Sequence, residues 1–164
     1  MTVATQPRAI PLVLPAGDGE RIWIAGDTVR ITATSEETAG AFTMLEVLVS
    51  PGSGPPLHIH EAEDEAFYVL DGEFEFVVDG EVSRVGAGGF VLVPRQTAHA
   101  WHNAGDAPAR LLVMFTPGGL EGFFREAGQV AGDDGPAPPV DAAEIARTEA
   151  AGRRYGLRVV DWSR

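Results

Sequence analysis

Two histidines, His58 and His60, stand one residue apart in the segment "PPLHIHEAEDEAFYVLDGE", which covers residues 55–73. Four carboxylates follow at positions 61, 63, 64 and 65. Side chains two residues apart on a β-strand point to the same side, so these two imidazoles can converge on one ion. Imidazole and carboxylate donors together suit divalent first-row metals. The segment is therefore either half of a metal site or a solvated acidic loop that carries histidines.

Glu65 is the acid best placed to join the histidines. It opens a run in which Glu65, Phe67 and Val69 share one face, so it would be the polar end of an apolar stripe. A lone carboxylate in such a place is costly unless it is paired or bound to a metal. If residues 58–60 and 65–70 pair as antiparallel strands, Glu65 lies on the same inward face as the imidazoles.

A third histidine is needed for a convincing site, and His99 is the candidate. It lies on a later strand, where the alternation of side chains puts His99 and Trp101 on one face and His102 on the other. We expect His102 to be structural or on the surface, and Trp101 to belong to the core or to a pocket wall. The remaining acids of the first segment are expected to be solvated, at the rim of the site: Glu61, Glu63 and Asp64.

The composition excludes several classes of protein. The 164 residues hold no cysteine, which excludes disulfides and thiolate ligands. The formal charge is −12 and the 12 basic residues are scattered, so nucleic acid and anionic membranes are poor candidates as partners. No segment approaches the roughly 20 apolar residues of a membrane span, and no signal sequence is evident. These features predict one soluble, cytoplasmic protein.

The middle of the chain has the pattern of an all-β barrel. Apolar runs flank Asp71-Gly72 and Asp79-Gly80, and Asp-Gly between strands is typical of a type I′ turn, so we expect successive hairpins there. A further turn is expected at Gly26-Asp27. Core positions are predicted for four phenylalanines, Phe67, Phe74, Phe76 and Phe90. Residues expected to line a pocket are Phe42, Met44, Val113 and Phe115, and no catalytic role is expected for Tyr68.

Three regions are expected along the chain. Residues 1–20, with three prolines, read as an extended arm; residues 21–117 form the barrel; residues 118–164 form a helical extension that packs on it. Helices are predicted over 120–130 and 141–152, the second with Asp141 as N-cap, Glu144 three residues on and Gly152 as the stop. Exposed strand edges and the arm predict a homodimer.

Two stretches of the sequence resemble the two motifs of the cupin superfamily. In the first, five residues separate Gly52 from His58, four separate His60 from Glu65, and six separate Glu65 from Gly72. Fifteen residues separate the end of the first motif, Gly72, from the start of the second, Gly88. There five residues separate Gly88 from Pro94, and His99 and Asn103 follow at the family's spacing, but Gln96 stands where the family usually has a turn glycine.

The resemblance implies a fold and a ligand set. The fold would be a double-stranded β-helix, a jelly-roll-like barrel, with a short C-terminal helical tail. The metal ligands would be His58, His60, Glu65 and His99. Such a three-His, one-Glu set suits one divalent ion among Fe, Ni, Mn, Co, Cu and Zn.

A narrower resemblance bears on activity. The first motif segment, the tail "GGLEGFFREAG" and the later "RRYGL" look like bacterial monocupins of the quercetin 2,3-dioxygenase-like group. That likeness implies a metal-dependent dioxygenase acting with O2 on a small aromatic, phenolic or enolisable substrate. Glu65 would then also be catalytic, taking the proton of the substrate hydroxyl.

Two alternatives from other classes stay open. Similar monocupins serve as polyketide cyclases or isomerases, in which a metal such as Zn polarises a carbonyl without oxidation. A cupin can also bind a small molecule with little or no catalysis, because fold alone does not give function.

Overall fold

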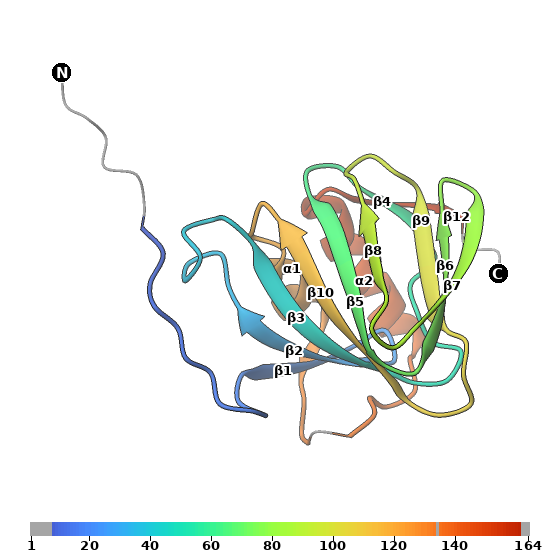
Figure 1. Ribbon diagram of the computed structural model, residues 1–164, viewed down its shortest axis with the longest axis horizontal. Coiled ribbons are helices and arrows are strands. Elements are labelled where there is room, and N and C mark those ends of the chain that lie inside the picture. Colours follow the sequence, from blue (N-terminus) through green and yellow to red (C-terminus); the bar gives the residue numbers. More distant parts are fainter. Residues whose placement is uncertain (1–7, 134, 162–164) are drawn as a thin grey trace.

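Two antiparallel sheets face each other and enclose the apolar core (Figure 1). The computed structural model describes residues 8–133 and 135–161. The larger sheet has the order β11-β1-β2-β3-β10-β5-β8. Its strands are β1 (Glu20–Ile24), β2 (Asp27–Ala33), β3 (Thr43–Val49), β5 (Asp64–Asp71), β8 (Phe90–Val93), β10 (Ala109–Thr116) and β11 (Gln129–Val130). The expected all-β fold is confirmed.

The smaller sheet has the order β12-β4-β9-β6-β7. Its strands are β4 (Leu57–His60), β6 (Glu73–Val78), β7 (Glu81–Gly86), β9 (His99–Asn103) and β12 (Leu157–Asp161). Along β3 and β10 every second residue is buried, as a sheet with one face in the core requires. Phe67, Phe74 and Phe76 lie in that core as predicted, but Phe90 does not: it is 62% exposed on β8, because its strand turns this side chain outward.

Of the three turns predicted from the sequence, one is found as predicted and two differ. Asp79 and Gly80 both have positive φ, 51° and 83°, and close the β6–β7 hairpin. Asp71-Gly72 closes no hairpin, because β5 and β6 belong to different sheets. Gly72 instead lets the chain cross close to Ala109, whose Cβ would lie 2.5 Å from a Cβ at this position. The first turn lies at Ala25-Gly26 rather than one residue later.

Two helices follow the barrel strands, α1 (Glu121–Ala127) and α2 (Ala142–Arg154). Asp141 caps α2 as expected, accepting a hydrogen bond of 2.7 Å from the Glu144 amide. The prediction that Gly152 ends α2 was wrong: Gly152 is a buried helical residue packed near Leu157, and the helix runs on to Arg154. Neither helix in the described ranges is long and apolar enough to cross a membrane.

The chain then returns to the smaller sheet as β12, a strand that the sequence pattern did not reveal. β12 pairs with β4 in a register that sets Leu157 opposite His60 and Val159 opposite His58. The C-terminal extension therefore braces the strand that carries both histidines. The expected boundaries at residues 20 and 117 stay a prediction, and residues 1–7 and 162–164 of the outer regions lie outside the described residues.

Glu121 ties α1 to the larger sheet. Its carboxylate is only 6% exposed, and it accepts hydrogen bonds from the Ser35 amide at 2.9 Å, from the Ser35 and Thr43 hydroxyls and from the Gly119 amide at 3.1 Å. Burial raises the pKa of Glu121, but the hydrogen bonds from Ser35 and Thr43 outweigh it, and the pKa lies below its usual range. The charged form is therefore favoured by folding.

We expect Glu121→Gln to lower the free energy of unfolding at pH 7 by about 1–3 kcal/mol, because buried donors lose a charged acceptor. A depressed folded-state pKa stabilises the protein above the unfolded-state value, and that contribution disappears as pH falls through the folded-state value. The difference between wild type and variant should therefore shrink from pH 7 to pH 3 in urea unfolding. Glu36→Gln, at a nearby exposed position, is the control. A difference that stays constant with pH would contradict this account.

Candidate metal centre

The three histidines of the expected site come from two neighbouring strands. His58 and His60 lie on β4 and His99 lies on β9, where it pairs with His58 across the two strands. All three side chains are buried in the barrel. The alternation of side chains predicted from the sequence is thus what brings the imidazoles together.

Glu65 reaches the histidines by a route that the sequence did not predict. The expected pairing of residues 58–60 with 65–70 is wrong: β5 pairs with β10 and β8 in the larger sheet, whereas β4 pairs with β12 and β9 in the smaller one. Glu65 faces inward from the opposite sheet, and its carboxylate is 4% exposed. The cluster therefore spans the interior of the barrel and joins both sheets.

The donor atoms of the four residues lie within 4.8 Å of one another. His99 Nε2 lies 2.8 Å from Glu65 Oε2, and His60 Nε2 lies 3.1 Å from the same oxygen. His58 Nε2 lies 3.1 Å from His60 Nε2. Three imidazole nitrogens and one carboxylate oxygen facing one point fit a divalent transition metal ion.

In two of the histidines, the ring nitrogen that points away from the cluster contacts a backbone carbonyl. This contact determines which nitrogen of the ring faces the centre of the cluster. His58 Nδ1 lies 2.9 Å from the carbonyl oxygen of Pro56, and His99 Nδ1 lies 3.0 Å from that of Thr97. A carbonyl can only accept, so each Nδ1 carries the proton and each Nε2 keeps its lone pair for the interior. This second layer of contacts is the usual way in which proteins orient metal-binding imidazoles.

His60 differs, because its outward nitrogen faces an acid. His60 Nδ1 is buried and has no hydrogen-bond partner among the described residues, and the same is true of Glu63 Oε2. The two atoms are 3.9 Å apart. Glu63 was expected to be a solvated rim residue, but the structure turns its carboxylate toward His60 and leaves its side chain only 13% exposed.

Burial and mutual contact shift the pKa values in the cluster. Burial, together with the nearby His99 and His60, lowers the pKa of His58 to about 3, so this imidazole is neutral at pH 7. Burial raises the pKa of Glu65, but the attraction and hydrogen bonds of His60 and His99 outweigh it and hold the value well below its usual range. A neutral imidazole and a carboxylate are the protonation states that bind metals.

The other residues considered from the sequence divide between core, pocket and surface. Trp101 is buried and also lines the pocket, whereas His102, on the opposite face of β9, is only partly buried and outside it. Val113 and Phe115 line the pocket as predicted, but Phe42 and Met44 do not. On β3 it is Leu45, next to Met44, that points inward, and Phe42 precedes this strand. Tyr68 is 44% exposed on the outer face of the sheet, as the alternation of side chains along its strand indicated.

The turn at Gln96 keeps its shape without the glycine of the family pattern. Gln96 has φ of 67°, the left-handed conformation that glycine adopts most easily. Its amide donates a 2.8 Å hydrogen bond to the His60 carbonyl, and its side-chain Nε2 donates one of 2.7 Å to the Glu61 carbonyl. These bonds help to hold the end of β4, so the departure from the pattern leaves the cluster intact.

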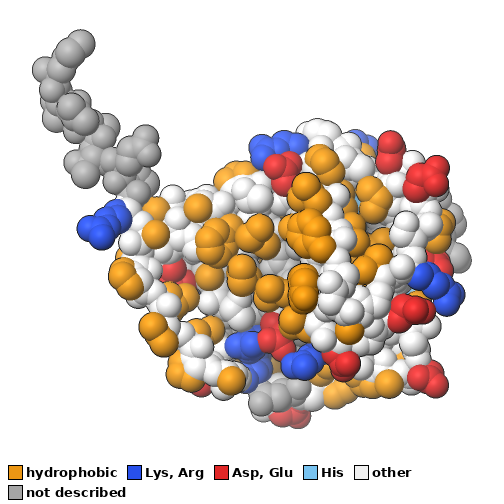
Figure 2. All heavy atoms as spheres, viewed as in Figure 1, with side chains coloured by type: hydrophobic (Ala, Val, Ile, Leu, Met, Phe, Trp, Pro, Cys, Tyr) orange, Lys and Arg blue, Asp and Glu red, His pale blue; other side chains and the backbone are white. Residues whose placement is uncertain are grey.

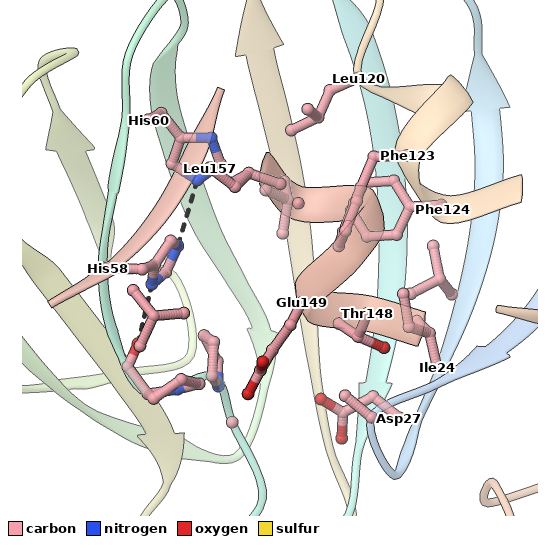
Figure 3. Close-up of a pocket in the computed structure, with 18 of the residues that line it drawn as sticks. Ile24, Asp27, His58, His60, Leu120, Phe123, Phe124, Thr148, Glu149 and Leu157 are labelled. Atoms are coloured by element: carbon pink, nitrogen blue, oxygen red, sulfur yellow. Dashed lines mark hydrogen bonds between the residues drawn. The ribbon is translucent and has the colours of Figure 1, made fainter. Parts of the chain in front are cut away.

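The cluster lies at one end of a pocket of about 510 Å³ (Figure 3). Apolar side chains from both sheets and both helices form most of the wall. Leu157 of β12 lies beside His60, and Phe123 and Phe124 of α1 lie across the pocket from the histidines. A volume of this size is ordinary for a small-molecule site. The fold and the cluster together define a small β-barrel with a candidate metal centre open to an apolar pocket.

Comparisons with known proteins agree with this description. A sequence model described as "Cupin domain" matches residues 45–115. Quercetin 2,3-dioxygenase of Bacillus subtilis is 31% identical over 120 residues, which are 73% of this chain, and the chain spans 35% of that enzyme's length. Polyketide synthase CurC of Streptomyces cyaneus is 30% identical over 70 residues, 43% of this chain and 46% of that protein.

A solved structure extends the agreement to the fold. The crystal structure of a predicted oxalate decarboxylase from Thermotoga maritima matches with a TM-score of 0.60 at 20% identity, covering 65% of this chain and 99% of that one. The chain belongs to the cupin superfamily, in the bacterial group that is similar to quercetin 2,3-dioxygenase.

We expect His99→Ala to lower the metal content of the purified protein at least about tenfold, because it removes one donor and leaves Glu65 without a 2.8 Å contact. The measurement is elemental analysis of protein prepared without added metal or chelator. His102→Ala, on the same strand but the other face, is the matched control and should keep its metal. Equal metal content in the two variants would reject this donor set.

Proposed function

We propose that this chain is a metal-dependent cupin dioxygenase of the quercetinase type, acting with O2 on a small aromatic, phenolic or enolisable substrate. The observation that carries the proposal is the cluster of His58, His60, Glu65 and His99 at the end of an apolar pocket. The similarity to quercetin 2,3-dioxygenase over 73% of the chain supports it.

Different groups of the site would have different roles in such a reaction. A bound divalent ion would supply Lewis acidity and open positions for the substrate oxygen and for O2. The apolar walls, with Phe115 beside His60 at a ring distance of 5.4 Å, exclude water from the reacting end. Residues of the two helices line the same space, where they would hold a flat molecule against the barrel.

Glu65 is the residue placed to take a proton. Its Oε2 faces the centre of the cluster between His60 and His99, and its low pKa keeps it ionised at neutral pH. A substrate hydroxyl that enters the cluster would meet this carboxylate, which can accept the proton and leave an enolate or phenolate.

We expect Glu65→Gln to lower turnover at least about a hundredfold while metal content falls less than about threefold, because the amide can still donate an oxygen but cannot take up the proton. O2 uptake with a flavonol and elemental analysis of the same sample measure the two effects. Unchanged turnover in a metal-replete variant would reject the base role, and a proportional loss of metal and turnover would make Glu65 a ligand only.

A second function is favoured by the similarity to polyketide synthase CurC. The same cluster and pocket would serve a non-oxidative reaction, a cyclisation or isomerisation in which a carbonyl is polarised. Tightly bound Zn with no O2 uptake on any phenolic substrate would favour this function over the oxidative one.

We also propose a homodimer, for which the outer face of the larger sheet is the supporting observation. Large apolar side chains are exposed there, over β5 and the edge strand β8, as Figure 2 shows. They are Tyr68, Leu70, Phe90 and Leu92. A strand edge beside an exposed apolar face is a surface that proteins usually cover. The cytoplasmic location expected from the sequence stays a prediction.

We expect Phe90→Glu to raise the dissociation constant of the dimer by about tenfold or more, because it puts a charge in the apolar face. Light scattering coupled to size-exclusion chromatography measures it. Val82→Glu is the control, since Val82 is 61% exposed on β7, at the edge of the other sheet. A monomeric wild type, or the same effect in both variants, would contradict the proposal.

A further inference from the structure

One of the three buried histidines lacks the outward contact that holds the other two. In His58 and His99, Nδ1 lies against a backbone carbonyl, at 2.9 and 3.0 Å. In His60, Nδ1 is buried and has no hydrogen-bond partner in the part of the chain that the structure describes. A buried polar atom without a partner costs free energy, so native structures rarely keep one without a reason.

The acid that faces this nitrogen is Glu63. Its Oε2 lies 3.9 Å from His60 Nδ1, and the Glu63 side chain is 13% exposed. This oxygen is itself buried and has no hydrogen-bond partner within the described ranges. A ring nitrogen that can donate thus faces a carboxylate oxygen that can accept, and neither has another partner there.

The position of the proton on His60 decides whether this pair forms a hydrogen bond. At the centre of the cluster, His60 Nε2 lies 3.1 Å from Glu65 Oε2 and 3.1 Å from His58 Nε2. An imidazole that gives its Nε2 lone pair to a divalent ion carries its proton on Nδ1. Occupation of the centre would therefore make His60 Nδ1 a donor on the side that faces Glu63.

Glu63 lies in a short loop that is fastened on both sides. Residues 61–63 connect β4 with β5. On one side, the Glu61 carbonyl accepts a 2.7 Å hydrogen bond from Gln96 Nε2. On the other side, Asp64 Oδ1 accepts two hydrogen bonds of 2.9 Å, from the amide and from Nε of Arg95. The Glu63 carboxylate is therefore held in place before any ion binds, as a positioning group requires.

A carboxylate at this position acts on one imidazole of the three. His58 and His99 face neutral carbonyl oxygens, whereas His60 faces an acid. A carboxylate partner fixes the orientation of a metal-binding imidazole and makes it a stronger donor to the metal. Because the side chains of His60 and Glu63 are only 4% and 13% exposed, water screens their interaction less than it would at the surface.

We propose that Glu63 is a positioning residue of the metal centre. Its carboxylate accepts a hydrogen bond from His60 Nδ1 and holds the ring with Nε2 toward the ion, without touching the ion itself. In the metal-free protein Oε2 has no partner among the described residues, so the contact favours metal binding and not the metal-free fold. The inference rests on the candidate metal centre and not on the reaction proposed for it.

The test measures the affinity of the full chain for Zn²⁺ by competition with a chelator. We expect Glu63→Gln to weaken Zn²⁺ binding by about tenfold or more, because it removes the charged partner of a metal-binding imidazole. Glu61→Gln is the matched control, since it removes the same charge at an exposed position of the same loop. It should weaken Zn²⁺ binding by less than about threefold, because exposed charges are screened by water.

Two further measurements distinguish positioning from a structural role. In protein saturated with Co²⁺, the visible absorption bands, which report the geometry of the ligands, should shift in Glu63→Gln and not in Glu61→Gln. In the metal-free protein, the urea midpoint of Glu63→Gln should be no lower than that of wild type, because the buried Oε2 has no described partner to lose.

Equal Zn²⁺ affinity in Glu63→Gln and wild type would overturn the inference. A lowered urea midpoint with an unchanged Co²⁺ spectrum would also overturn it, because Glu63 would then support only the fold. A wild type that binds neither ion would overturn it together with the metal centre. Failure of the proposed dioxygenase reaction is distinct from these outcomes: it is the absence of O2 uptake in a protein that binds metal and shows the effect of Glu63→Gln.

Discussion

One carboxylate oxygen, Glu65 Oε2, connects the two sheets of this barrel. It lies 2.8 Å from His99 Nε2 and 3.1 Å from His60 Nε2, both of which come from the sheet opposite its own. A carboxylate that is 4% exposed is unfavourable without such partners. The two sheets must therefore hold all four polar residues at fixed positions relative to one another.

The strand β4 shows how this requirement is met. It is only four residues long and has a single register pair with β9, so β12 from the far end of the chain supplies its other neighbour. Gln96 adds a hydrogen bond to the carbonyl of His60, and Gly156 accepts one from the Glu61 amide. A short strand with two candidate ligands is thus held by segments that are distant in sequence.

The sequence pattern correctly predicted those features of the site that depend on a single strand. Alternation along a strand was enough to place His58 beside His60, and Glu65 on the face of Phe67. It was not enough to show that Glu65 belongs to the other sheet, because Asp71-Gly72 resembles a hairpin turn although it connects two sheets. Phe90 and Gly152 were misplaced for a related reason: their exposure and packing depend on tertiary neighbours, which residue type alone does not encode.

The two ends of the pocket come from different parts of the sequence. All four candidate ligands fall within residues 45–115, the part that matches the cupin family, whereas Asp27, Thr148 and Glu149 fall outside it. The barrel thus supplies the candidate metal centre, and the first hairpin and α2 supply the opposite end of the pocket. The Ala25–Glu144 hydrogen bond, at 2.7 Å, fixes the place where α2 meets the β1–β2 turn and so holds that end of the pocket together.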